Sequence, residues 1–304
     1  MALPQAPARA DRAGMGPNTE PAGSTPILAA YDGSPAAYRA TSWAAAEAAR
    51  SGRPLRIARI VRWPLPELDG LRLPADARTR PSTPGDLDAV VEHCRRLVPG
   101  ADVQVETLSG DPVALLTKLA DESALTVLGA SGQTMSGWVL LGSTAAEVAR
   151  RVGPPVVVVR HEPPCDGRPV VIGADGSPDG RAAVRAGFAF AERAGSPVEV
   201  VHAWSDLPVE ALGGPAAFDA TAARRDAAAL LSEQVADARR QHPELEVREL
   251  ALLDRPTVTL LARAVGAALL VVGRHGRAHP REVPLGSVSH ALLHYAHCPV
   301  MLVG

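Results

Sequence analysis

Two glycine-rich stretches of the sequence have residue types and spacings suited to binding an anion. The first is "LGASGQTMSGWVLLGST", residues 128–144, and the second is "VGRHGRAHPREVPLGSV", residues 272–288. Both contain the pattern G-x2-G-x9-G-S, at matching places in the two halves of the chain. Its members are Gly129, Gly132, Gly142 and Ser143 in the first stretch, and Gly273, Gly276, Gly286 and Ser287 in the second.

The chemistry that these residues could perform is the holding of a phosphate group. Glycine just after a strand can adopt a positive φ and lets a ligand approach the bare backbone. Successive exposed N–H groups then form a concave anion site. The Gly-Ser pairs precede an expected helix, whose free N–H groups and dipole favour phosphate. The serines could cap that helix or donate a hydroxyl to a phosphate oxygen, and a glycine-rich turn with an N-cap serine is the alternative interpretation.

An aspartate lies at the end of the first expected strand in each half. Asp32 belongs to "ILAAYDGSP" and Asp175 to "VVIGADGSP". With the strand order 3-2-1-4-5, each aspartate lies at the switch point where the ligand crevice of such a sheet opens. It would suit the hydrogen-bond donors of a nucleoside, or support a bound divalent metal indirectly. The alternative is a plain Asx turn in Asp-Gly-Ser.

The elements that must position these residues are repeated along the chain. The expected strands are 27–31, 55–61, 102–108, 124–129 and 155–160, then 169–174, 197–203, 245–252, 268–273 and 299–303. They are nearly continuous Val, Ile, Leu and Ala, as expected when helices cover both faces of a sheet. Their alternation with helical segments predicts an α/β fold with two tandem, doubly wound, parallel five-stranded sheets. For these Rossmann-like sheets we adopt the strand order 3-2-1-4-5.

The repeat also predicts the domain organisation. Residues 1–24, which are rich in Pro, Gly and Ala, are expected to form a disordered tail. Two domains follow at 25–160 and 169–304, joined by a proline-containing linker at 161–168. The intervals 63–84 and 205–216 precede the second helix of each copy, about 85–98 and 217–241. They are expected to be flaps over a ligand site or plain surface loops.

Composition excludes several functional classes. The chain has 304 residues and a formal net charge of -2, so it has no electrostatic footprint for nucleic acid or an anionic membrane. Lys118 is the only lysine and no glycine precedes it closely, which excludes a G-x4-G-K-[ST] phosphate loop. Cys94, Cys165 and Cys298 are too scattered for a disulfide framework or a cysteine zinc site. We find no secretory signal or apolar membrane span, and we expect a cytoplasmic protein.

The repeated "DGSP" and the complete G-x2-G-x9-G-S signature in both halves resemble a tandem member of the universal stress protein family, from about residue 26 onward. In that family the signature usually distinguishes the ATP-binding branch. The resemblance implies that final strands 155–160 and 299–303 pair within one chain to make a pseudo-dimer. It implies one ATP site lined by Asp32, Gly129, Gly132, Gly142 and Ser143, and another by Asp175, Gly273, Gly276, Gly286 and Ser287, with backbone N–H groups from Thr144 and Val288.

The two expected sites differ in charge. The loop between Gly129 and Gly142 carries no charged residue. The corresponding part of the second signature contains Arg274, His275, Arg277, His279, Arg281 and Glu282. This difference predicts that the second site binds a polyphosphate more tightly, and with a stronger dependence on salt. The alternative is a solvated loop whose arginines contact no ligand.

Histidines suggest one other site. His290, His294 and His297 are spaced i, i+4 and i+7 on the expected last helix, with Cys298 next, and such a face could bind zinc or copper. No carboxylate accompanies them, and the first copy has Ala146, Arg150 and Gly153 at these offsets, so we assign no metal site. His202, at the end of a strand, is interpreted as a structural histidine.

The sequence names no catalytic residue, because it has no Ser/His/Asp set, no Cys/His set and no paired carboxylates placed for acid–base chemistry. We therefore expect a non-enzymatic ATP-binding stress-response protein, which takes ATP with magnesium. Its nucleotide occupancy would be coupled to conformation or to an unidentified protein partner, and a homodimer is compatible with this reading. The alternatives are a weak ATPase or another adenine-nucleotide α/β enzyme, and a nucleotide-independent interaction module.

Overall fold

The computed structural model describes residues 25–61, 84–130, 141–161, 167–204, 220–277 and 285–304. The expected tail, the two expected flap intervals and most of the expected linker lie outside these residues. Gly132, His279, Arg281 and Glu282 of the two signature stretches also lie outside them. Within the described residues, no helix combines the length and the apolar character that a membrane crossing would need.

All ten expected strands are present, with ends within two residues of the expected positions. In the first half they are β1 (Ile27–Ala30), β2 (Leu55–Val61), β3 (Val103–Ser109), β4 (Leu125–Gly129) and β5 (Val156–Val159). In the second half they are β6 (Val170–Gly173), β7 (Val198–Ala203), β8 (Val247–Leu252), β9 (Leu269–Gly273) and β10 (Val300–Val303). Each half has the predicted order 3-2-1-4-5, and all pairings inside a half are parallel.

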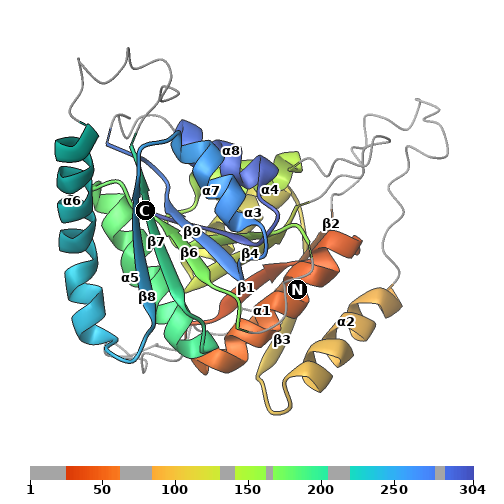
Figure 1. The fold of residues 1–304 in the computed structure, drawn as a ribbon. Coiled ribbons are helices and arrows are strands. Elements are labelled where there is room, and N and C mark those ends of the chain that lie inside the picture. The colour runs from red at the N-terminus through yellow and green to blue at the C-terminus, as the bar shows by residue number, and fades with distance from the viewer. Residues whose placement is uncertain (1–24, 62–83, 131–140, 162–166, 205–219, 278–284) are drawn as a thin grey trace, which may run out of the picture.

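The two halves are joined into a single ten-stranded sheet. β5 pairs with β10 antiparallel, with Val157 opposite Met301, so the strand order runs β3-β2-β1-β4-β5-β10-β9-β6-β7-β8 (Figure 1). This is the pairing of final strands that the sequence led us to expect. Because the central pair is antiparallel, the carboxyl ends of the first-half strands and those of the second-half strands lie at opposite edges of the sheet.

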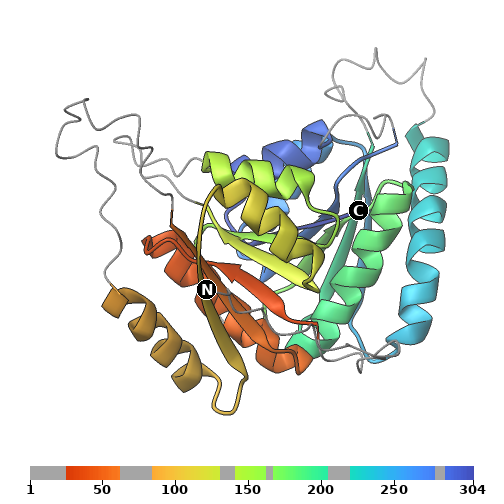
Figure 2. The same cartoon turned by 180° about the vertical axis from the view of Figure 1, so that it is seen from behind.

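Helices cover both faces of the sheet, as the apolar strands require. One layer contains α1 (Pro35–Ser51), α2 (Pro84–Leu97), α5 (Pro178–Ala194) and α6 (Ala220–Gln241). The other contains α3 (Pro112–Asp121), α4 (Ser143–Arg151), α7 (Pro256–Ala264) and α8 (Ser287–Tyr295). Figures 1 and 2 show the two layers on opposite sides of the sheet. Each layer buries one apolar cluster that continues from one half into the other.

The sequence determines where α1 and α5 begin. Ser34 and Ser177 are their N-caps, and each serine Oγ accepts a hydrogen bond from the amide three residues later, at 3.1 and 2.9 Å. A proline follows each serine, and its fixed φ suits the first helical position. The repeated "DGSP" is therefore a helix-starting turn in both halves.

A buried carboxylate joins α1 to α5 across the two halves. Glu47 of α1 is 2% exposed and accepts hydrogen bonds from Arg193 Nη2 at 2.6 Å and from Arg50 Nε at 3.1 Å. Beside it, the rings of Trp43 and Phe190 stack with centroids 5.8 Å apart. Because Arg50 lies on α1 and Arg193 on α5, one carboxylate neutralises a guanidinium from each half.

We predict that Glu47→Gln destabilises the protein. The substitution keeps the side-chain volume but removes the charge that both arginines face. Removing one partner of a fully buried ion pair costs about 3–5 kcal/mol, and we expect about 2 kcal/mol because Arg50 and Arg193 are 30% and 33% exposed. Urea unfolding followed by circular dichroism measures this loss. The matched control is Glu147→Gln, whose partners Arg150 and Arg151 are more exposed, with an expected change below about 1 kcal/mol. Equal losses in the two variants would contradict the prediction.

Candidate functional site

The two Asp-Gly turns have the Asx-turn geometry that the sequence left open. Asp32 Oδ1 accepts a hydrogen bond from Ser34 N at 2.9 Å, and Asp175 Oδ1 accepts one from Ser177 N at 3.0 Å. The positive φ values belong to the glycines that follow, 84° at Gly33 and 86° at Gly176. Each aspartate therefore holds the turn that starts the next helix, in addition to any role toward a ligand.

Asp175 has a second contact that Asp32 lacks among the described residues. Its Oδ2 accepts a hydrogen bond from the backbone N–H of Arg277 at 3.1 Å. A Cβ atom added to Gly276 would lie 2.9 Å from the same oxygen. Asp175 therefore connects the turn after β6 to the glycine segment after β9, and Gly276 leaves the room for this connection.

Gly129 and Gly273 lie against the first turns of the helices that follow β1 and β6. A Cβ on Gly129 would lie 2.6 Å from the carbonyl carbon of Ala36, and one on Gly273 would lie 2.8 Å from that of Asp179. The first turns of α1 and α5 thus occupy the space beside these glycines. None of the signature glycines that the structure describes has a positive φ. The expectation of a positive φ is therefore wrong for this pair, and the space beside each glycine is taken up by a helix.

The starts of α4 and α8 also differ from expectation in one respect. Gly142 and Gly286 are the N-caps, and Ser143 and Ser287 are the first helical residues, so neither serine caps its helix. Among the described residues, neither hydroxyl forms a hydrogen bond, and both serines are exposed. The hydroxyls are therefore available to a ligand.

Both helix starts also have amides without a protein acceptor. The first N–H groups with helical partners are those of Ala146 and His290, which donate to the carbonyls of Gly142 and Gly286. The preceding amides find no acceptor in the described part of the chain; they are Ser143, Thr144, Ala145, Ser287, Val288 and Ser289. These uncapped ends are the strongest anion-binding feature of the site.

A pocket of about 280 Å³ lies beside the second helix start. Residues 176–179 line one side, and His275, Gly276 and Arg277 line the other. A Cβ on Gly286 would lie 3.7 Å from Gly276 N and from His275 Cα, so the start of α8 adjoins the pocket. The pocket therefore combines the Asp-Gly turn, the glycine segment and an uncapped helix end.

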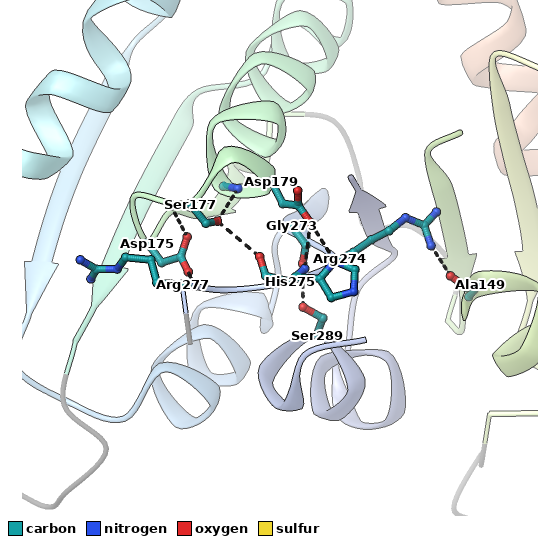
Figure 3. Close-up of polar contacts among 10 residues, drawn as sticks. Ala149, Asp175, Ser177, Asp179, Gly273, Arg274, His275, Arg277 and Ser289 are labelled. Carbon is teal, nitrogen blue, oxygen red and sulfur yellow. Dashed lines mark hydrogen bonds and ion pairs between the residues drawn. The ribbon is translucent and has the colours of Figure 1, made fainter. Parts of the chain in front are cut away.

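Side chains at the start of α5 hold the pocket segment in place (Figure 3). Asp179 Oδ2 accepts hydrogen bonds from His275 N at 3.1 Å and faces His275 Nδ1 at 3.0 Å. Ser177 Oγ donates to the carbonyl of His275 at 3.3 Å. Sequence reasoning missed these contacts, because Asp179 and His275 lie 96 residues apart and the repeat offers no counterpart: the first half has Ala36 at the place of Asp179.

Arg274 does not belong to the pocket, contrary to its inclusion among the charges of the second site. Its side chain is 6% exposed and donates a hydrogen bond to the carbonyl of Ala149 in the first half (Figure 3). It donates another to the carbonyl of Pro154. Burial lowers the pKa of its guanidinium. Arg277 is exposed, so among the described residues it is the arginine of this segment that a ligand could meet.

His202 and the histidines at and after α8 have contacts typical of structural residues. His202 is buried, its Nδ1 lies 2.7 Å from the carbonyl of Ala174, and burial lowers its pKa. The expected three-histidine face is wrong, because α8 ends at Tyr295 and His297 lies beyond it, stacked on His161 with ring centroids 5.7 Å apart. Within the described residues, no group of three His, Cys, Asp or Glu side chains is placed to hold a metal ion. Cys298 is buried, which raises its pKa to about 12.

We predict that Gly129→Ala and Gly273→Ala each lower the free energy of unfolding by about 2–3 kcal/mol, because the new methyl group meets helix backbone that cannot rotate away. Chemical unfolding measures the effect. Gly153→Ala is the matched control, since an added Cβ has no neighbour within 4 Å there and its φ is not positive, and we expect no loss of stability. A neutral result at positions 129 and 273 would disprove the packing role.

Comparisons with known proteins agree with the repeat and the fold. The model of the universal stress protein family matches residues 23–160 and again residues 167–304. A universal stress protein of Mycobacterium tuberculosis is 32% identical over 292 residues, covering 91% of this chain and 96% of the relative. One of Mycolicibacterium smegmatis is 30% identical over 285 residues, with 91% and 96% covered.

Solved structures support the same architecture. A universal stress protein from Archaeoglobus fulgidus superimposes with a TM-score of 0.62 at 17% identity, covering 91% of this chain and 97% of that one. A Pseudomonas aeruginosa protein described as functionally unknown gives a TM-score of 0.60 at 14% identity, with 92% of each chain covered. These likenesses concern the fold. Together with the two family matches, they show that this chain belongs to the universal stress protein family, with two copies of its domain in tandem.

Proposed function

We propose that the protein binds ATP at the two signature sites, and that nucleotide occupancy controls its conformation or its binding to a protein partner. The observation that supports this most is the pair of uncapped helix starts at Ser143 and Ser287. Each follows the glycine segment that leaves the carboxyl end of β4 or β9. Six amides and two hydroxyls that have no partner among the described residues are a donor set for phosphate oxygens. The carboxyl-end edge of a doubly wound sheet is where such folds bind ligands.

The second site has the fuller set of described groups for a polyphosphate. The amides of Ser287 and Val288 and the Ser287 hydroxyl would hold phosphate oxygens, and the exposed Arg277 would add a positive charge. Magnesium would arrive with the nucleotide and neutralise part of its charge. Both oxygens of Asp175 already accept backbone N–H groups, so this carboxylate suits the shaping of the site better than direct ligation of the metal.

A second candidate function, slow nucleotide hydrolysis, is favoured by one specific contact. His275 lies in the pocket with its Nδ1 3.0 Å from the carboxylate of Asp179, and a histidine oriented by a carboxylate is a common general base. The sequence offered no candidate base, because this pair forms only in the folded chain. Binding without turnover remains our main proposal, since the uncapped helix starts and the repeated signature support phosphate binding at both sites, whereas the His275–Asp179 pair exists only at the second.

We predict that the purified protein binds two Mg-ATP per chain, and that Gly142→Arg and Gly286→Arg each reduce this number to one. An arginine side chain at either N-cap would occupy the space in front of the free amides. Isothermal titration calorimetry counts the sites, and mass spectrometry of the denatured protein identifies any nucleotide that copurifies. Near-ultraviolet circular dichroism shows whether each variant keeps its fold. No nucleotide in the preparation and no heat of binding would leave the nucleotide-independent interaction module as the better reading.

We further predict that Gly142→Arg, which retains the second site, binds Mg-ATP about fivefold more tightly than Gly286→Arg, which retains the first. An additional exposed ion pair contributes up to about 1 kcal/mol, which corresponds to this ratio. The difference in affinity between the two variants should shrink as the NaCl concentration is raised, because exposed charges are screened. Arg277→Gln in the Gly142→Arg background should remove it. Equal affinities of the two single-site variants would contradict the predicted asymmetry.

Hydrolysis is tested separately from binding. If the wild type releases phosphate from Mg-ATP, we predict that His275→Gln lowers the turnover by about 100-fold, the lower range for loss of a general base, while the affinity measured by calorimetry changes little. Phosphate release that is unchanged in His275→Gln would exclude this histidine as the base.

A further inference from the structure

Two buried arginines cross between the halves of the protein and reach the same place in the repeat. Arg274, between Gly273 and His275 of the second signature, donates hydrogen bonds to the carbonyl of Ala149 (Figure 3) and to that of Pro154. Arg160, just after β5, donates to the carbonyl of Leu293. Ala149 in α4 and Leu293 in α8 occupy corresponding positions of the two copies. Each arginine therefore reaches the last turn of the other half's signature helix.

Duplication of the domain does not account for this symmetry. The first half has Ala130 at the position of Arg274, and the second half has Gly304 at the position of Arg160. A Cβ added to Gly304 would lie 2.7 Å from Arg274 Cδ, so the arginine occupies the space that this glycine leaves. Two different positions in the repeat thus supply the same contact.

The contact satisfies a physical requirement of each helix. The last carbonyls of an α-helix have no partner within the helix, and a positive charge beside them interacts favourably with the helix dipole. Arg160 and Arg274 are 5% and 6% exposed, and burial lowers the pKa of both. A buried guanidinium without hydrogen-bond partners is costly. Separation of either arginine from its helix end is therefore unfavourable.

The backbone of Arg274 belongs to the second candidate site. Its carbonyl accepts a hydrogen bond from the N-cap residue Gly286 at 2.9 Å, and its N–H donates to Val303 of β10 at 2.8 Å. Its side chain meanwhile holds the carboxyl end of α4, whose amino end begins the first candidate site at Ser143. A shift of the glycine segment at the second site would therefore act on α4 through buried, hydrogen-bonded atoms.

We propose that Arg274 couples the two nucleotide sites, so that a polyphosphate bound at the second site raises the affinity of the first. The inference rests on the proposed function of both sites. Binding at the second site orders the segment around Arg274 and thereby holds α4, so the first site binds its ligand with less loss of conformational entropy. Linkage requires the effect to be reciprocal: occupancy of the first site raises the affinity of the second by the same factor.

Calorimetric titration with Mg-ATP tests this coupling. The affinity of the first site is compared between the wild type, where the second site fills, and Gly286→Arg, where it cannot. We expect the affinity of the first site to fall at least about fivefold in Gly286→Arg. The second site of Gly142→Arg should bind more weakly, by the same factor, than the second site of the wild type with its first site occupied, as obtained from a fit of the wild-type titration with one coupling constant. The reciprocal measurement separates coupling from a local effect of either arginine substitution, because a local effect has no reason to match.

The same titrations are repeated after Arg274→Met is introduced into the wild type, Gly142→Arg and Gly286→Arg. Methionine keeps much of the apolar stem but removes the donors, so we expect both factors to fall below about twofold. Arg193→Met is the matched control, because Arg193 also joins the two halves through Glu47 but lies in neither site; we expect it to retain the full coupling. Intact coupling in Arg274→Met, or equal loss in Arg193→Met, would overturn the role of Arg274.

Hydrogen exchange provides a readout that needs no nucleotide. We expect the amides in the last turn of α4 to exchange faster in Arg274→Met than in the wild type, and to be unchanged in Arg193→Met. Unchanged exchange in Arg274→Met would show that the arginine does not hold α4. Absence of Mg-ATP binding at both sites would overturn the proposed function and the coupling with it, whereas binding with intact coupling in Arg274→Met would overturn the coupling role alone.

Discussion

The antiparallel pairing of β5 with β10 is the contact on which the rest of the architecture depends. Without it, each five-stranded sheet would end in an apolar strand with unpaired backbone groups, which is a site for aggregation. With it, both strands become central and all eight of their residues are buried. The pairing also places the two candidate sites at opposite edges of one sheet. The carboxyl ends of α4 and α8 therefore lie near the site of the other half, where Arg274 and Arg160 reach them.

The glycine signature combines two physical tasks that the residue types alone do not separate. Gly129 and Gly273 lack side chains because the first turn of α1 or α5 passes within contact distance of them. Gly142 and Gly286 begin helices without a side-chain cap, which leaves amides free for an anion. The first task positions a helix against a strand, and the second concerns a ligand.

The two halves share a fold but have diverged around their candidate sites. In the second half Asp175 holds the amide of Arg277, Asp179 holds His275, and Ser289 Oγ donates to the carbonyl of Gly273 at 2.7 Å. The first half has Ala36 and Ala145 where the second has Asp179 and Ser289, so it cannot form the last two contacts. Two of the contacts that hold the second glycine segment therefore have no equivalent in the first half.

The sequence by itself determined the repeat, the positions of the ten strands, the Asp-Gly turns after the first strand of each half, and the family resemblance. These features are local or periodic, so apolar runs, capping residues and spacing record them. Only the tertiary structure decided which neighbours each residue meets. It placed Arg274, one of the charges expected at the second site, in a buried contact with α4, set the first turns of α1 and α5 against Gly129 and Gly273, and joined Asp179 to His275 across 96 residues. Such contacts depend on how chain segments distant in sequence pack together, and no periodicity or local propensity encodes that geometry.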